Sequence, residues 1–297
     1  MKRLFLGLCV LGLLGAGAFL LITRPTTADA AQVAALTPDP KHGETVFWIG
    51  GCVSCHAADK AEGAALLVLS GGKRFVTDFG TFIAPNISPD PVNGIGTWSA
   101  HDLANAMLHG TSPKGEHYYP AFPYASYAHA SLQDIVDLKA FIDTLPKSDR
   151  VNVPHELGFP FNIRLSLGGW KLLFLSDAPA VPTDGLTPIE QRGQYLVEGL
   201  GHCGECHTPR NMLGGRTMSR WLAGGPNPDG KGKIPNITPA KLTWSEADIV
   251  EYLTSGFTPE FDSAGGSMVD VIANTAHLSP EDRAAIAAYL KKVPAVE

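Results

Sequence analysis

Two short stretches of the sequence decide how this chain folds: Cys52-Val53-Ser54-Cys55-His56 and Cys203-Gly204-Glu205-Cys206-His207. Both follow the pattern C-x-x-C-H, and together they hold four of the five cysteines in the chain. The fifth, Cys9, lies in an apolar run near the N-terminus, where we expect an inert small hydrophobe. An uncommon pattern that occurs twice indicates that the chain is built from two copies of one unit.

The repetition extends beyond the cysteines. A glycine precedes the first motif by nine residues (Gly43) and the second by ten (Gly193), and each opens a stretch of helical pattern. Two further segments recur downstream in the same order: Pro85-Asn86-Ile87-Ser88-Pro89 with Pro235-Asn236-Ile237-Thr238-Pro239, and Thr97-Trp98-Ser99 with Thr243-Trp244-Ser245. Self-similarity of this kind marks an internal duplication, so we expect two tandem domains of one fold.

Helix signals recur in both copies. Ser99 and Ser245 are natural N-caps, each in front of apolar residues with helical spacing. Each copy then ends in another amphipathic helix, expected over residues 132–145 and 280–293, which a proline stops. Both copies are therefore predicted to be helical.

These signals place the two modules at residues 38–148 and 188–297. The connection between them, residues 149–187, is rich in Pro and Gly. Its segments 159–161 and 170–175 are nevertheless too apolar for a free tether. We therefore expect the connection to pack against the domains.

Length and composition agree with two small globular domains. The chain has 297 residues, which is about two domains of ordinary size. With 44% hydrophobic and 18% charged residues, packed cores are available and wholesale disorder is not expected. The formal net charge of −6, without a long Lys/Arg run, argues against a nucleic-acid partner. A protein partner with a basic patch fits better.

The first 30 residues read as a membrane anchor or an export signal. Lys2 and Arg3 precede an uncharged apolar run of nineteen residues, 4–22. A cleavable signal has an apolar core of roughly 7 to 15 residues, so the length favours a retained transmembrane helix within residues 1–30. The alternative is cleavage near Ala30, after Ala28-Asp29-Ala30, which leaves a soluble periplasmic protein. In either case the positive-inside rule places the two modules on the periplasmic side of a bacterial inner membrane.

The C-x-x-C-H motifs predict two covalently bound haem c groups. Two cysteines three residues apart at a helix start can reach the two vinyl groups of a porphyrin, and the following histidine can ligate its iron. The predicted attachment residues are Cys52, Cys55, His56, Cys203, Cys206 and His207. A zinc site would require the two cysteine pairs to come together, and neither zinc nor a disulfide explains a histidine after both pairs.

The second axial ligand is clearer in the second module than in the first. Met268 is expected in a Gly-rich loop ahead of the terminal helix, and we predict that it ligates haem two together with His207. The corresponding region of the first module, residues 119–130, contains no methionine. His129 is the leading candidate there, with an ordinary loop histidine as the equal alternative. Weaker candidates are Met107, which is expected to be a core residue, His117 and His109, and haem one could also have an open site.

Taken together, these motifs resemble the dihaem cytochrome c subunits that accompany periplasmic dehydrogenases, which are related to the cytochrome subunits of membrane-bound alcohol and gluconate dehydrogenases. The resemblance covers nearly everything after residue 40. Its most specific pieces are residues 85–89, 94–99, 118–127, 199–211 and the ligand loop at 266–268. It implies an all-α fold of two tandem class I cytochrome c domains after an N-terminal transmembrane helix.

The chain departs from this family at haem one. Relatives usually carry a methionine in place of Phe122 or near Ala130, and this chain has neither. The family's His/Met ligation therefore does not carry over to haem one. Arg210, which follows the second motif, is predicted to pair either with a haem propionate or with a surface carboxylate.

The predicted function is electron transfer between a periplasmic dehydrogenase or other redox protein and the respiratory chain. Nothing else looks catalytic, because the sequence has no nucleotide-binding Gly-rich loop, no G-x-S-x-G and no H-E-x-x-H. The alternative is a dihaem enzyme, peroxidase-like or thiosulfate-oxidising, that uses an open or replaceable ligand site at haem one. A cysteine-ligated sulfur enzyme would need a spare cysteine near haem one, and a gas sensor would need an output domain.

Overall fold

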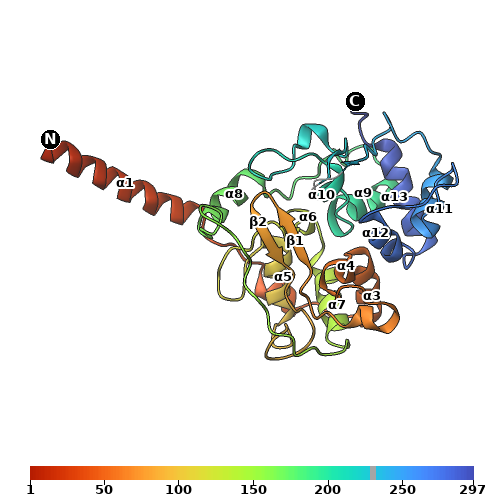
Figure 1. The fold of residues 1–297 in the computed structure, drawn as a ribbon, viewed down its shortest axis with the longest axis horizontal. Helices are drawn as coiled ribbons and strands as arrows, with labels where there is room; N and C mark the ends of the chain where they lie inside the picture. Colours follow the sequence, from red (N-terminus) through yellow and green to blue (C-terminus); the bar gives the residue numbers. More distant parts are fainter. Residues whose placement is uncertain (228–231) are drawn as a thin grey trace.

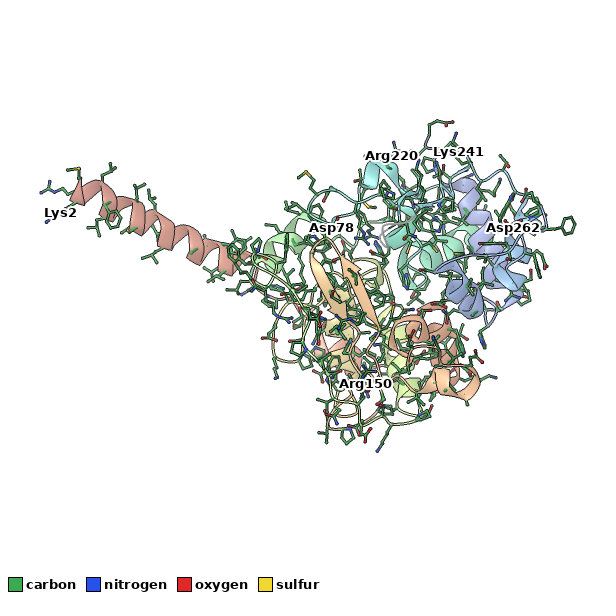
Figure 2. The ribbon with its side chains drawn as sticks, viewed as in Figure 1. Lys2, Asp78, Arg150, Arg220, Lys241 and Asp262 are labelled. Atoms are coloured by element: carbon green, nitrogen blue, oxygen red, sulfur yellow. The ribbon has the colours of Figure 1, made fainter. Side chains whose placement is uncertain are left out.

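A single helix projects from the body of the molecule at the N-terminal end (Figure 1). The computed structural model describes residues 1–227 and 232–297. Helix α1, Lys2–Ile22, has a mean hydropathy of 2.5 and none of its residues is buried. Figure 2 shows its side chains free along its length, with Lys2 at the far end. Helix α1 thus has the length and composition of a membrane span or an export signal.

The first module begins after the short helix α2, Ala30–Ala34. Its elements are α3 (Pro40–Ile49), α4 (Cys52–His56), η1 (Gly63–Leu67), β1 (Arg74–Thr77), β2 (Gly80–Ile83), α5 (Ala100–His109), α6 (Tyr124–Tyr127) and α7 (Leu132–Ile142). A connector follows, which contains α8 (Ser166–Phe174).

The second module repeats this order. Its elements are α9 (Pro188–Gln194), η2 (Tyr195–Leu200), α10 (Gly204–His207), η3 (Met218–Arg220), β3 (Gly225–Pro226), β4 (Lys233–Ile234), α11 (Glu246–Ser255), α12 (Met268–Thr275) and α13 (Pro280–Lys292). The expectation of an all-α chain is thus met only in part. The two antiparallel hairpins, β1–β2 and β3–β4, add short strands to a mainly helical chain. In the first hairpin the segment Arg74–Thr77 carries aromatic and β-branched residues, which favour strand geometry.

In each module the first and last helices cross where the first helix has a glycine. A Cβ on Gly43 would lie 2.0 Å from the carbonyl oxygen of Asp137 in α7, and one on Gly193 would lie 1.9 Å from that of Ala285 in α13. No side chain fits at such distances, so the glycines allow the helix backbones to touch. Each crossing fixes the helix that leads into a C-x-x-C-H motif.

The unequal spacing of these glycines from the motifs has a structural cause. In the first module α3 runs as an ordinary helix up to Gly50. In the second module the equivalent stretch changes from α-helix to the π-helical turn η2. A π turn accommodates one extra residue without breaking the helix. The one additional residue between Gly193 and Cys203 is therefore absorbed in η2, and both motifs begin at equivalent places.

The predicted N-caps are confirmed. Ser99 and Ser245 each accept a hydrogen bond from the backbone amide three residues on, and Asp102 and Asp248 complete a capping box in α5 and α11. The terminal helices α7 and α13 begin in the same way, at Ser131 and Ser279, although they end one to three residues before the limits expected from the sequence.

The two modules pack directly on each other. One continuous cluster of buried apolar residues runs through both, from Phe47 and Ile135 in the first to Val197 and Ile286 in the second. At the interface the Trp48 ring stacks on His277, with 3.7 Å between the ring centroids and an interplanar angle of 2°. The modules therefore have a fixed orientation relative to each other, which matters for the positions of the two C-x-x-C-H motifs.

Candidate haem-binding sites

Both cysteine motifs form single helical turns at equivalent places in their modules. Residues Cys52–His56 make up α4, and Gly51 in front of it has a φ of 61°, a left-handed conformation that glycine adopts without strain. In the second module Cys203 is the N-cap of α10, Gly204–His207. Helical spacing places both cysteines and the histidine of each motif on one turn, as attachment to a single porphyrin edge requires.

The two motif histidines are oriented in the same way. The Nδ1 atom of His56 lies 2.8 Å from the carbonyl oxygen of Pro85, and that of His207 lies 2.8 Å from the carbonyl oxygen of Pro235. Because a carbonyl only accepts, Nδ1 donates, and Nε2 is left with its lone pair for a metal. Burial lowers the pKa of both histidines, which favours the neutral form that ligates iron. Both sites therefore fit haem iron.

The loops that carry these carbonyls are held by matching asparagines. The Asn86 amide donates to the carbonyl oxygens of Ser148 and Arg150, and the Asn236 amide donates to that of Val296. Each asparagine also accepts a hydrogen bond from the backbone amide two residues later. The repeated Pro-Asn-Ile segments are thus built to fix a histidine ring, which is a role that their spacing alone did not reveal.

Met268 occupies a different local structure from the one expected. It is the first residue of α12 rather than part of a loop, because the segment Gly265–Ser267 turns directly into the helix. Its side chain is partly buried and packs against the main apolar cluster. The other methionine with a buried position, Met107, lies in α5 within the core of the first module, as expected. Ligation of haem two by Met268 stays a prediction.

His129 faces the second module and the connector. It lines a cavity of about 240 Å³ together with Phe174 and Arg216. Burial lowers the pKa of His129, and the charge of Glu198 acts in the opposite direction. Because His129 packs between the second module and the connector, ligation of haem one by His129 stays a prediction that competes with an interface role.

The two weaker histidine candidates lie near the end of α1. The Nε2 atom of His117 lies 2.9 Å from the carbonyl oxygen of Thr23, and Nδ1 of His109 lies 3.4 Å from the Thr26 hydroxyl. Both rings are therefore engaged by the segment that follows the apolar helix.

Arg210 is paired with a carboxylate of its own motif. Its Nη2 atom lies 2.5 Å from an oxygen of Glu205, and Nη1 donates to the carbonyl oxygen of Gly214. Glu205 also accepts a hydrogen bond of 2.6 Å from the Ser126 hydroxyl of the first module. Of the two predicted partners, the contacts show the carboxylate, and pairing of Arg210 with a propionate stays a prediction.

No pattern in the sequence indicates that motif two lies against the first module. Glu205 lies within motif two, and Arg216, 3.4 Å from it, donates to the backbone of Ala125 in the first module. Motif one contacts the second module as well: the Asn274 amide donates to the Ser54 hydroxyl at 2.7 Å, and a Cβ on Gly51, just before motif one, would lie 3.5 Å from Nε2 of His202, just before motif two. Both motifs therefore lie on the surfaces by which the two modules face each other.

A cluster suited to a metal ion lies elsewhere. Among the described residues, one group of three or more His, Cys, Asp or Glu ligand atoms within 4.8 Å of one another is found, namely His42, Asp134 and Asp137. The cysteines are not part of it, so the part of the chain that the structure describes holds no cysteine cluster of zinc type.

Comparisons with known proteins agree with this geometry. The family model for cytochrome c matches residues 40–146 and 190–294. A diheme cytochrome c-type protein of Cereibacter sphaeroides is 62% identical over the full length of both chains. The fructose dehydrogenase cytochrome subunit of Gluconobacter japonicus is 35% identical over 92% of this chain. The cytochrome c subunit of the quinone alcohol dehydrogenase of Gluconobacter oxydans is 36% identical over 86% of this chain. This chain covers 55% of each of these two subunits.

Proposed function

Because the chain belongs to the cytochrome c family and carries two covalent haem c groups, we propose that it passes electrons on the periplasmic side of a bacterial inner membrane, from a dehydrogenase to the respiratory chain. The observation that carries this proposal is the position of both C-x-x-C-H motifs at the interface between the modules, where Ser126 donates to Glu205 of motif two and Asn274 donates to Ser54 of motif one. The similarity to cytochrome subunits of dehydrogenases supports the kind of donor.

Haem c supplies reversible one-electron oxidation and reduction at its iron, and the protein supplies position and potential. Pro85 and Pro235 orient the ligand histidines, and hydrogen bonds from Ser126 to Glu205 and from Asn274 to Ser54 fix both attachment sites at the module interface. With Met268 as its second ligand, haem two would have the higher potential. Electrons would then run downhill from haem one to haem two, and equal measured potentials would contradict this direction.

Substitution of Met268 tests the ligand of haem two. In Met268→Leu we expect the weak red-end absorption band of Met-ligated ferric haem to disappear and the potential of one haem to fall, because the thioether sulfur, which raises the potential of a haem, is lost. Met107→Leu is the matched control, since Met107 is a buried core residue of the other module, and its spectrum should keep the band. A Met268→Leu protein that retains the band would refute the assignment.

A second function is favoured by one specific observation. His129 lies at the module interface, one ring nitrogen each of His117 and His109 is engaged near the end of α1, and Met107 lies in the core, so the packing gives each candidate ligand of haem one another structural role. Haem one with an open site could bind an external ligand, as a peroxidase-like enzyme requires.

Low-temperature EPR of the oxidised protein separates the two functions, with His129→Ala as the comparison. Two low-spin haems in the wild type, one of which becomes high-spin in His129→Ala, would establish an electron relay with His129 as a ligand. A wild-type high-spin haem that binds cyanide, unchanged in His129→Ala, would instead establish an open site at haem one.

A further inference from the structure

The connector between the modules carries an exposed apolar surface at the base of α1. We name it the connector surface, and it consists of Phe159, Phe161, Ile163, Leu165, Leu172 and Leu173. Within α8 the side chains of Leu172 and Leu173 are 64% and 66% exposed, whereas Leu167 and Gly168 are buried. Single exposed apolar residues are common on protein surfaces, but six large ones in one short segment are not. A concentration of this kind marks an interaction site.

This surface adjoins the end of α1. A Cβ on Gly168 would lie 2.6 Å from the Thr23 side chain, and one on Gly169 would lie 3.2 Å from the ring of Phe19. Figure 1 shows α8 at the point where α1 joins the body of the molecule. The two small residues thus let α8 lie directly against the last turn of α1. A membrane crossed by α1 would have its surface at this level.

The charges of the segment have a single sign. Residues 157–175 contain Arg164 and Lys171 and no Asp or Glu. Arg24, which follows α1, and Arg164 also line a cavity of about 300 Å³ with Leu20 and Leu165, where the two cations outnumber the single carboxylate, Glu116. Basic residues beside exposed apolar ones are typical of segments that lie in the interface of a membrane with anionic lipids, whereas the chain as a whole has a net charge of −6.

We infer that the connector surface lies in the outer leaflet of the membrane beside α1, with Arg24 and Arg164 at the level of anionic phospholipid headgroups. The inference rests on the proposed membrane span of α1. The protein would then have two attachments to the membrane, the spanning helix α1 and the connector surface in the interface. Together they fix the orientation of the haem modules toward the membrane. A single flexible anchor would leave that orientation free.

The test uses the full-length, haem-loaded protein in vesicles of phosphatidylcholine and a phosphatidylglycerol that carries a photoreactive group in its acyl chain. After illumination, mass spectrometry maps the lipid adducts to peptides. We expect adducts in α1 and in residues 159–174, and none near Val92, which is 83% exposed on the first module. Leu172→Glu/Leu173→Glu should lose the adducts in the connector and keep those in α1.

A matched control is Val151→Glu/Val153→Glu, which changes two exposed residues of the connector outside the surface and should leave all adducts in place. Adducts in α1 alone would overturn the inference while the membrane span stands. Absence of adducts from α1 would overturn the span and the inference together. A connector that is protected from water-borne hydroxyl radicals but has no lipid adducts would show that protein covers it, and would also overturn the inference.

Discussion

The carboxylate of Glu205 binds three side chains at the interface between the modules, and its removal tests how much this buried pair stabilises the fold. Only 11% of the Glu205 side chain is exposed, and Arg216, 9% exposed, lies beside it. Arg210 pairs with the same carboxylate at 2.5 Å, and the Ser126 hydroxyl donates to it across the interface. In Glu205→Ala the Arg216 guanidinium would remain buried without its counter-charge, and one link between the modules would be lost.

The expected loss follows from burial. Removing one partner of a buried ion pair costs about 3 to 5 kcal/mol, because the remaining charge stays desolvated. Arg210 is 33% exposed and can be solvated after the change, so the lower end applies. We therefore predict that Glu205→Ala lowers the free energy of unfolding by about 3 kcal/mol.

Urea unfolding followed by far-UV circular dichroism measures this loss, on protein whose haem content matches the wild type. The matched control is Glu156→Ala, which removes the same kind of pair, Arg74–Glu156, with side chains 51% and 57% exposed. Exposed ion pairs contribute little, so this control should unfold like the wild type. A loss below about 1 kcal/mol in Glu205→Ala would refute a structural role for the buried pair.

The same pair predicts how stability changes with pH. Burial alone would raise the pKa of Glu205, but the charges of Arg216 and Arg210 and the hydrogen bond from Ser126 outweigh it and hold the pKa below the ordinary value of 4.5. A lowered folded-state pKa stabilises the fold above the unfolded value, and this stabilisation is lost as the pH falls through the folded value. Below pH 4.5 the wild type should therefore lose more stability than Glu205→Ala.

Two further pairs of substitutions test the duplicated framework. Gly43→Ala and Gly193→Ala should each lower the midpoint of thermal unfolding, because the new methyl group would lie 2.0 or 1.9 Å from a backbone carbonyl oxygen. In the control, Gly158→Ala, the methyl group has nothing within 4 Å, and the midpoint should stay at the wild-type value. Equal midpoints in all three variants would contradict the helix crossings. Ser99→Ala and Ser245→Ala should each cost about 1 kcal/mol in urea unfolding through loss of an N-cap, and Ser→Thr at the same positions should restore most of it.

The framework of each module was predictable because local signals determine it. The C-x-x-C-H motifs, the capping serines and the proline stops each act over a few residues, and Ser99 and Ser245 begin their helices as expected. The hairpin β1–β2 was not predicted, since its strands have only four residues each and lie in a loop region. Met268 was expected in a loop because glycines precede it, but a helix begins directly after them.

The contacts between the two modules could not be predicted from the sequence, for a different reason. Its contacts join residues far apart in the chain, such as Ser126 with Glu205, Ser54 with Asn274, and Trp48 with His277. No periodicity or spacing relates such residues, and surface area buried between two domains has no local pattern. The burial of Glu205 depends on such a contact, because carboxylates are rarely buried unless they are paired, and its partner Arg216 lies outside the motif.

The duplication itself bears on the ligand of haem one. His129 and His277 each stand two residues before the N-cap serine of the last helix, and Trp48 and Gly199 each stand four residues before the first motif cysteine. The contacts are reciprocal: His277 stacks on Trp48 of the first module, and a Cβ on Gly199 of the second module would lie 3.4 Å from Cβ of His129. His277 is thus an interface residue in a module whose proposed ligand is Met268. By this symmetry His129 has the position of an interface residue too, so an EPR spectrum that His129→Ala leaves unchanged is the outcome that the packing favours.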